Sequence, residues 1–161
     1  MLNIETIDKL NKTVAVCNRH KTYLTFALQQ TAELFPITSD KYDHLTQIQV
    51  SFLDQMIYRF SKLQDNIGSR LFKTLLDYLG EEPETMAFKD MLLRLEKLRI
   101  LPSANEWFEL REIRNLVSHE YPEDIDKLIA GLNLLHIQTS RLIEIYNGLL
   151  TYLNDTISFK V

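Results

Sequence analysis

The chain has 161 residues, a net charge of −4 and a single cysteine, and this size suits one domain over residues 1–161 whose core needs neither a disulfide nor a structural metal. The acidic balance argues against a general nucleic-acid coat protein, so any contact with RNA must be local. The lone Cys17 and the lack of any apolar run of roughly 20 residues predict a soluble, cytoplasmic protein that does not enter a membrane.

The distribution of apolar residues predicts an all-α protein. Only four glycines and four prolines are present, and apolar residues recur at spacings of three and four, which is typical of helices rather than strands. A first stripe of this kind runs from Ile7 to Thr31 and predicts a long helix that Pro36 ends. A second begins after the capping side chains of residues 38–40 and extends from near residue 42 to residue 79, with a kink expected at Gly68.

The second predicted helix carries more apolar residues than one packing face requires. At about 1.5 Å per residue, a helix over 42–79 is on the order of 55 Å long, more than one small bundle layer covers. Val50, Leu53 and Leu76 lie beside its main stripe and widen it toward a second face. Such a face predicts contact with a partner subunit.

Turns separate the next two predicted helices. Residues 80–84 form a turn, after which apolar residues over 88–98 predict a shorter helix. Ser103, with Glu106 three residues later, is typical of a capping box at the start of the fourth helix.

The fourth and last helices meet at Pro122. A proline disfavours a helical conformation at the residue before it, so the fourth helix should yield near Tyr121. The segment 122–124 suits the first turn of a last helix of about eight turns. Short connections between these helices predict an up-and-down bundle of four to five long helices.

The stretch Arg114-Asn115-Leu116-Val117-Ser118-His119-Glu120-Tyr121 places three chemically useful side chains at a helix end. On a regular helix Arg114 and Tyr121 share a face, whereas His119 is rotated from Arg114 by about 140°. Loosening of the helix near Pro122 would bring all three together. The guanidinium of Arg114 grips a phosphate with two hydrogen bonds, and His119 exchanges protons near neutral pH, so the pair suits phosphodiester chemistry.

Cleavage of RNA through its own 2′-hydroxyl makes three demands on such a site. It needs a base for that hydroxyl, an acid for the leaving 5′-oxygen, and positive charge near the phosphorane. A two-fold dimer that brings both copies of Arg114 and His119 to its interface supplies two imidazoles and two guanidiniums around one phosphate. The mechanism therefore predicts a homodimer.

The motif and its flanks resemble the HepT toxins of the HEPN superfamily. Arg114, His119 and Tyr121, set between Leu110-Arg111-Glu112-Ile113 and Pro122-Glu123-Asp124, have a spacing similar to the signature of these toxins. The likeness extends over most of the chain through the order of the long helices. It implies a HEPN-like helical domain.

The resemblance also implies a function, that of the toxin in a type VII-like toxin–antitoxin pair. Such a toxin is a metal-independent endoribonuclease that acts as a homodimer, uses no cofactor and has Arg114 and His119 in the positions of its catalytic pair. Its antitoxin is a minimal nucleotidyltransferase that transfers AMP from ATP onto the motif tyrosine, here Tyr121. Each added phosphate would place negative charge and bulk beside the arginine that holds RNA.

Further polar residues are candidates for RNA binding or for support of the motif. Arg59, Lys62 and Arg70 give the second predicted helix a local positive charge, with Asp65 between them, and Asn115 follows the motif arginine. These cations could line an RNA groove. They could equally form surface ion pairs along one helix.

The motif residues could also have purely structural or non-catalytic roles. Arg114 could be an arginine held in a salt bridge while His119 caps helix carbonyls, and Tyr121 could be an aromatic plug that packs on Trp107. A non-catalytic helical subunit that presents substrate to a nucleotidyltransferase would use the same polar residues without cleaving anything.

Other kinds of site have little support in the sequence. His20, His44 and His136 are scattered without the paired spacing of zinc ligands, so no metal site is expected. No glycine-rich phosphate loop, serine nucleophile motif or paired carboxylate arrangement occurs, which excludes nucleotide hydrolases and the common esterases.

Overall fold

A computed structural model describes residues 4–118 and 124–157, and every regular element in these ranges is helical. The principal helices are α1 (Ile4–Thr31), α3 (Gln47–Asn66), α4 (Phe72–Tyr78), α5 (Phe88–Lys97), α6 (Ala104–Ser118) and α7 (Ile125–Ile157). A π-helical segment (Ile67–Leu71) joins α3 to α4, and the connections contain α2 (Ser39–Asp43) and two 3₁₀ turns (Ala32–Leu34, Pro83–Thr85). The expected all-α bundle is therefore confirmed.

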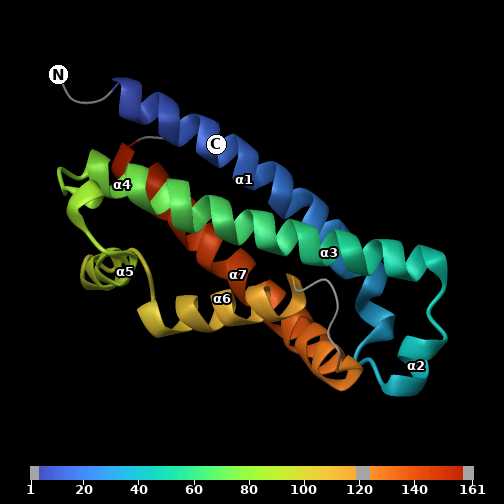
Figure 1. The fold of residues 1–161 in the computed structure, drawn as a ribbon. Helices are drawn as coiled ribbons and strands as arrows, with labels where there is room; N and C mark the ends of the chain where they lie inside the picture. Colours follow the sequence, from blue (N-terminus) through green and yellow to red (C-terminus); the bar gives the residue numbers. More distant parts are fainter. Residues whose placement is uncertain (1–3, 119–123, 158–161) are drawn as a thin grey trace.

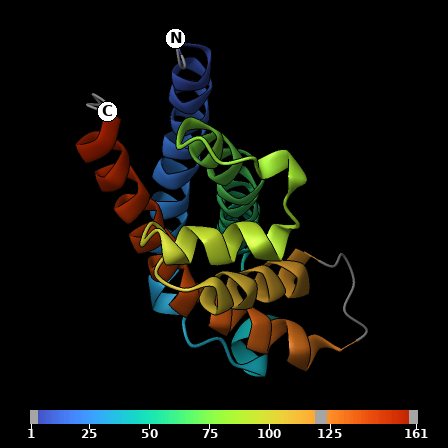
Figure 2. The ribbon, with the colours of Figure 1, turned by 90° about the vertical axis from the view of Figure 1, so that its left-hand side faces the viewer.

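The long helices run alternately up and down. Figure 1 shows α1 antiparallel to the rod formed by α3 and α4, with α6 and α7 forming a second antiparallel pair. Helix α5 is seen end-on in Figure 1 and lengthwise in Figure 2, so it crosses the bundle beside α4 and α6. A contact between Ser118 and Ser61, whose hydroxyl oxygens are 3.3 Å apart, places the end of α6 against the C-terminal part of α3.

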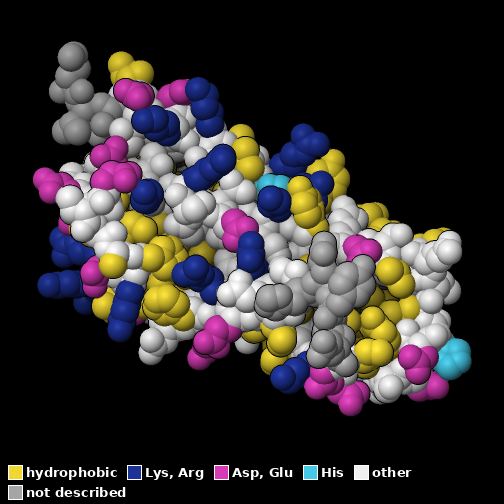
Figure 3. Space-filling model, in the orientation of Figure 1, with side chains coloured by type: hydrophobic (Ala, Val, Ile, Leu, Met, Phe, Trp, Pro, Cys, Tyr) yellow, Lys and Arg dark blue, Asp and Glu magenta, His cyan; other side chains and the backbone are white. Residues whose placement is uncertain are grey.

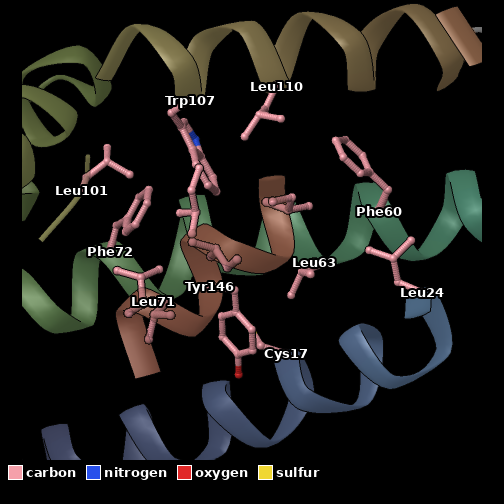
Figure 4. Close-up of a cluster of buried hydrophobic side chains, with 14 of the residues drawn as sticks. Cys17, Leu24, Phe60, Leu63, Leu71, Phe72, Leu101, Trp107, Leu110 and Tyr146 are labelled. Atoms are coloured by element: carbon pink, nitrogen blue, oxygen red, sulfur yellow. The ribbon is translucent and has the colours of Figure 1, made fainter. Parts of the chain in front are cut away.

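One hydrophobic core joins these helices. Trp107, Phe60, Phe72 and Tyr146 are among its largest fully buried side chains, and Figure 4 shows them converging from α6, α3, α4 and α7. The Trp107 and Phe72 rings meet edge to face with centroids 4.8 Å apart. The Tyr146 hydroxyl, carried into the core, donates to Oδ1 of Asn18 at 2.7 Å. Burial of each large apolar side chain contributes about 1.5–3 kcal/mol.

The second predicted helix begins later than expected. Thr38 does cap a helix, since its hydroxyl accepts from the Lys41 amide at 3.2 Å, but that helix is the short α2. Helix α3 starts only at Gln47, where Thr46 and Gln49 form a capping box. The stronger start signal at Thr46 divides the segment that apolar spacing alone had joined.

Gly68 marks an irregularity in this helix, as expected, but in the form of a π turn. It lies in the segment Ile67–Leu71, whose backbone follows the wider π-helical pattern. A Cβ built on Gly68 would be 3.5 Å from Cζ2 of Trp107, so the absence of a side chain lets α6 pack closely against this turn.

Most apolar side chains of α3 and α4 are buried by other helices of the same chain. Leu53 and Leu76 are 4% and 0% exposed, so the sequence argument that they face a partner subunit is wrong. Large apolar residues left outside on α3 are Ile48, Val50 and Tyr58, which are 70%, 40% and 51% exposed. Helix α1 covers the second face instead, because it packs along the length of α3.

The N-terminal caps of α6 and α7 differ in part from those expected. Ser103 accepts a hydrogen bond from the Glu106 amide at 3.2 Å, as expected. The Glu106 carboxylate does not complete a capping box, because it pairs with Arg141 of α7. Asp124 precedes α7 rather than lying in its first turn, and its carboxylate accepts from the amides of residues 126 and 127.

Candidate functional site

Arg114 lies in the last turns of α6 and is held by two neighbours. Its Nη2 donates to Oδ2 of Asp65 on α3 at 2.9 Å, and its Nη1 donates to Oδ1 of Asn115 at 3.1 Å. The side chains of Arg114 and Asp65 are 33% and 44% exposed, so the pair is reachable from solvent. Arg114, Asp65 and Asn115 therefore form one hydrogen-bonded cluster.

These two hydrogen bonds leave other N–H donors of the Arg114 guanidinium free. A guanidinium has five N–H donors in a rigid fork, and two of them are used by Asp65 and Asn115. The Nε of Arg114 is buried and has no hydrogen-bond partner among the described residues. The second N–H on each of the two terminal nitrogens can bind an oxyanion while Asp65 fixes the direction in which the fork points.

Close packing fixes the end of α6 that carries Arg114. A Cβ built on Gly131 of α7 would lie 3.0 Å from Cδ2 of Leu116 and 3.3 Å from Cγ1 of Val117, so a larger residue there would push the two helices apart. On the other side, the Ser61–Ser118 contact ties the same turn to α3. The motif arginine therefore extends from a rigid support.

The other two motif residues, His119 and Tyr121, lie outside the described residues. Helix α6 ends at Ser118, one residue before the motif histidine in the sequence. The chain is described again from Asp124, which caps α7.

Arg59 and Lys62 belong to a different face of α3. Nη1 of Arg59 lies 3.0 Å from Nδ1 of His20 on α1, and its guanidinium carbon lies 4.4 Å from the ring centroid of Tyr23. Nζ of Lys62 lies 5.7 Å from the ring centroid of Tyr58. The alternative that these cations pair with Asp65 along the helix is wrong, because Asp65 pairs with Arg114 instead.

His20 is the centre of this second cluster, although its position in the sequence predicted no role for it. An arginine N–H can only donate, so Nδ1 of His20 is the acceptor and carries no proton there. Burial lowers the pKa of His20, and the nearby cations Arg59, Lys62 and Arg19 lower it further. Figure 3 shows dark blue side chains gathered around a histidine where α1 crosses α3. The spacing of Arg19, His20 and Tyr23 was the available signal.

Arg70 joins neither group. It lines a separate surface hollow between α1 and α4, together with Lys9 and Asp77. Of the five supporting residues suggested by sequence, two therefore lie with Arg114, two lie with His20, and Arg70 stands apart.

The described residues contain neither a metal-binding cluster nor a membrane-spanning helix. Within residues 4–118 and 124–157, no group of three or more His, Cys, Asp and Glu side chains is arranged to hold a metal ion. No helix in the same ranges is both long enough and apolar enough to cross a membrane.

Comparison of the chain with protein-family models, with curated proteins and with solved structures found no match. The family resemblance therefore stands on the motif and the helix order in the sequence.

Proposed function

We propose that this chain is a metal-independent endoribonuclease of the HepT type, the toxin of a HEPN/nucleotidyltransferase toxin–antitoxin pair. The observation that carries the proposal is the placement of Arg114 at the end of α6, oriented by Asp65 and with N–H donors to spare. In the sequence His119 follows five residues later. An arginine that holds the scissile phosphate beside a histidine that moves protons is the arrangement RNA cleavage needs.

The proposed reaction uses the RNA as its own nucleophile. The 2′-oxygen loses its proton to one imidazole and forms a bond to the adjacent phosphorus, while the bond from phosphorus to the 5′-oxygen breaks. The leaving 5′-oxygen takes a proton from a second imidazole, and the products are a 2′,3′-cyclic phosphate and a 5′-hydroxyl. Arg114 stabilises the added negative charge on the phosphorane.

Because one chain offers one motif histidine, the proposal includes a homodimer in which two copies of His119 face one phosphate. Support comes from two apolar side chains left exposed on one side of α7, where Leu134 and Ile137 are 45% and 65% exposed. A second copy that covers them would remove this apolar surface from water.

Regulation in this proposal acts on Tyr121. Transfer of AMP from ATP to its hydroxyl forms a phosphodiester and releases pyrophosphate, and the new phosphate competes with RNA for Arg114. The cognate minimal nucleotidyltransferase is the partner that catalyses this transfer.

A second candidate is a non-catalytic helical subunit that presents substrate to a nucleotidyltransferase. The observation in its favour is the ion pair itself, because Asp65 offsets the charge of Arg114 at 2.9 Å. An arginine used only to join α6 to α3 would be expected to have such a partner.

Expression in a host that lacks the nucleotidyltransferase separates the two candidates. The toxin should arrest growth, His119→Ala should restore it at equal protein level, and coexpression with the nucleotidyltransferase should add AMP to Tyr121 by mass spectrometry. Normal growth with the unaltered chain would favour the non-catalytic subunit.

A further inference from the structure

A groove lies next to the Asp65–Arg114 pair, between the π segment, α5 and α6. Its volume is about 640 Å³, within the usual range for small-molecule sites. It is lined by Gln64, Asp65, Gly68, Ser69, Lys73, Met86, Phe88, Met91, Trp107 and Arg111. None of the side chains except Asp65 has a role in the proposed cleavage.

Two buried polar groups in the lining have no hydrogen-bond partner in the part of the chain described. Gln64 is 2% exposed, and both its Oε1 and its Nε2 are unpaired. Trp107 is fully buried, and its indole Nε1 is also unpaired. Buried polar groups are nearly always paired, and leaving them unpaired costs stability. Leucine and phenylalanine would fill the same space without that cost, so the two groups are suited to bonding with something else.

The π turn brings the indole to the groove. The nearest heavy atoms to a Cβ built on Gly68 are Cζ2 and Nε1 of Trp107, at 3.5 and 3.6 Å. The indole N–H therefore lies against the π segment, whose Gly68 and Ser69 line the groove. Single π turns inside helices are frequent at functional sites, because the wider turn displaces the side chains that follow it.

The walls and mouth of the groove add flat apolar surface and positive charge. Met86, Phe88 and Met91 contribute the apolar side chains, and methionines adapt their shape to a ligand. The guanidinium carbon of Arg111 lies 4.6 Å from the ring centroid of Phe88, and Arg111 has no acidic partner among the residues described. In Figure 3 yellow and dark blue side chains lie side by side over this end of the molecule.

We propose that the groove binds a nucleobase, whose edge bonds to the Gln64 amide and the Trp107 N–H and whose attached phosphate contacts Arg111. A glutamine amide offers a donor and an acceptor in one plane, as the edge of a base does, and glutamine is a common partner of adenine for this reason. Flat apolar walls favour an aromatic ring over a peptide amide. The proposal goes beyond ribonuclease activity, because binding uses neither Arg114 nor His119.

The single tryptophan of the chain makes the site directly observable. Its indole group gives one ¹H–¹⁵N resonance, which can be followed in ¹⁵N-labelled protein during titration with AMP, CMP, GMP and UMP. A short single-stranded oligoribonucleotide is added to the His119→Ala chain so that it is not cut. Inorganic phosphate is the control for an anion without a base.

A saturable shift of the indole resonance with a mononucleotide, absent with phosphate, supports a free nucleotide as ligand. A shift with the oligoribonucleotide alone supports a base held within RNA. No shift with any nucleotide or oligoribonucleotide would overturn the proposal, as would a shift with phosphate of equal size. If the unaltered chain binds nucleotide in this groove but does not cleave RNA, the proposed ribonuclease activity is refuted and the nucleobase site is still supported.

Gln64→Leu tests the hydrogen bonds, with Gln30→Leu on the exposed surface of α1 as the matched control. We expect the nucleotide Kd to rise at least tenfold in Gln64→Leu only, with no loss in melting temperature because an unpaired amide is removed. Equal affinity in the two variants would contradict the role of Gln64. If Gln64→Leu does not fold, Arg111→Gln is the second test, and unchanged affinity for nucleotide phosphate there would equally contradict the site.

Discussion

The ion pair between Arg114 and Asp65 allows a test in which the two partners should behave differently. If Arg114 binds the scissile phosphate, Arg114→Ala should lower kcat/KM for RNA by about 10²–10³, the usual loss when one transition-state contact is removed. Asp65→Ala leaves the guanidinium in place and removes only one of its two fixed partners. We expect a loss of no more than about tenfold, or about 1.4 kcal/mol, from the poorer orientation of Arg114.

The effect on folding should be small and nearly equal for both substitutions. At 33% and 44% exposure, solvent screens the pair, and exposed pairs contribute about 0.2–1 kcal/mol. For a domain of this size 1 kcal/mol corresponds to about 2–4 °C in Tm. Loss of structure therefore cannot explain a large loss of cleavage in Arg114→Ala.

The assay combines thermal unfolding with cleavage of labelled single-stranded RNA in EDTA. Arg94→Ala is the matched control, because Arg94 has similar exposure, 36%, and pairs with Glu81 at 2.5 Å. Arg94→Ala should keep full activity. If Arg114→Ala and Asp65→Ala reduce cleavage by the same factor, Arg114 acts only as a structural partner of Asp65, and its assignment to the phosphate is refuted.

Four further predictions concern other parts of the fold. Burial raises the pKa of Cys17 to about 12, so a thiol reagent at pH 8 should modify the folded protein at the rate of unfolding, and rapid modification would contradict this burial. Lys62 is one of the cations that lower the pKa of His20, so Lys62→Gln should raise that pKa in an NMR titration. The pKa values of His20 and His136 are lowered in the folded protein, so the unfolded chain binds more protons near and below neutral pH. The free energy of unfolding from urea titrations should therefore fall as pH drops below about 6.5. This fall should be smaller in His20→Gln. If the chain forms the proposed dimer through α7, Ile137→Asp should be a monomer in light scattering, and a dimer that persists in this variant would place the interface elsewhere.

The fold could be predicted from the sequence where spacing and caps agree. The stripe ending near Thr31 and the cap at Ser103 correspond to the end of α1 and the start of α6. Spacing failed between residues 42 and 47, where Thr46 starts a new helix that the apolar pattern does not register. It also failed for Leu53 and Leu76, since an apolar residue cannot indicate whether its own chain or a partner covers it.

Only part of the candidate site could be predicted from the sequence, because its residues come from different helices. Asp65 and Arg114 are 49 positions apart, and only the crossing of α3 and α6 brings them together. The packing of α1 along α3 brings Arg59 to His20, a contact that no spacing along one helix could indicate. Gln64 was hidden because an unpaired buried amide looks like any other glutamine until its surroundings are known.

The most direct test of the central claim is the chemistry of the RNA product. Purified chain freed of nucleotidyltransferase should cleave single-stranded RNA in excess EDTA and leave a 2′,3′-cyclic phosphate with a 5′-hydroxyl end. His119→Ala, folded and dimeric to the same extent, should leave the RNA intact. Equal cleavage by both chains, or intact RNA with both, would contradict catalysis by the Arg114–His119 motif.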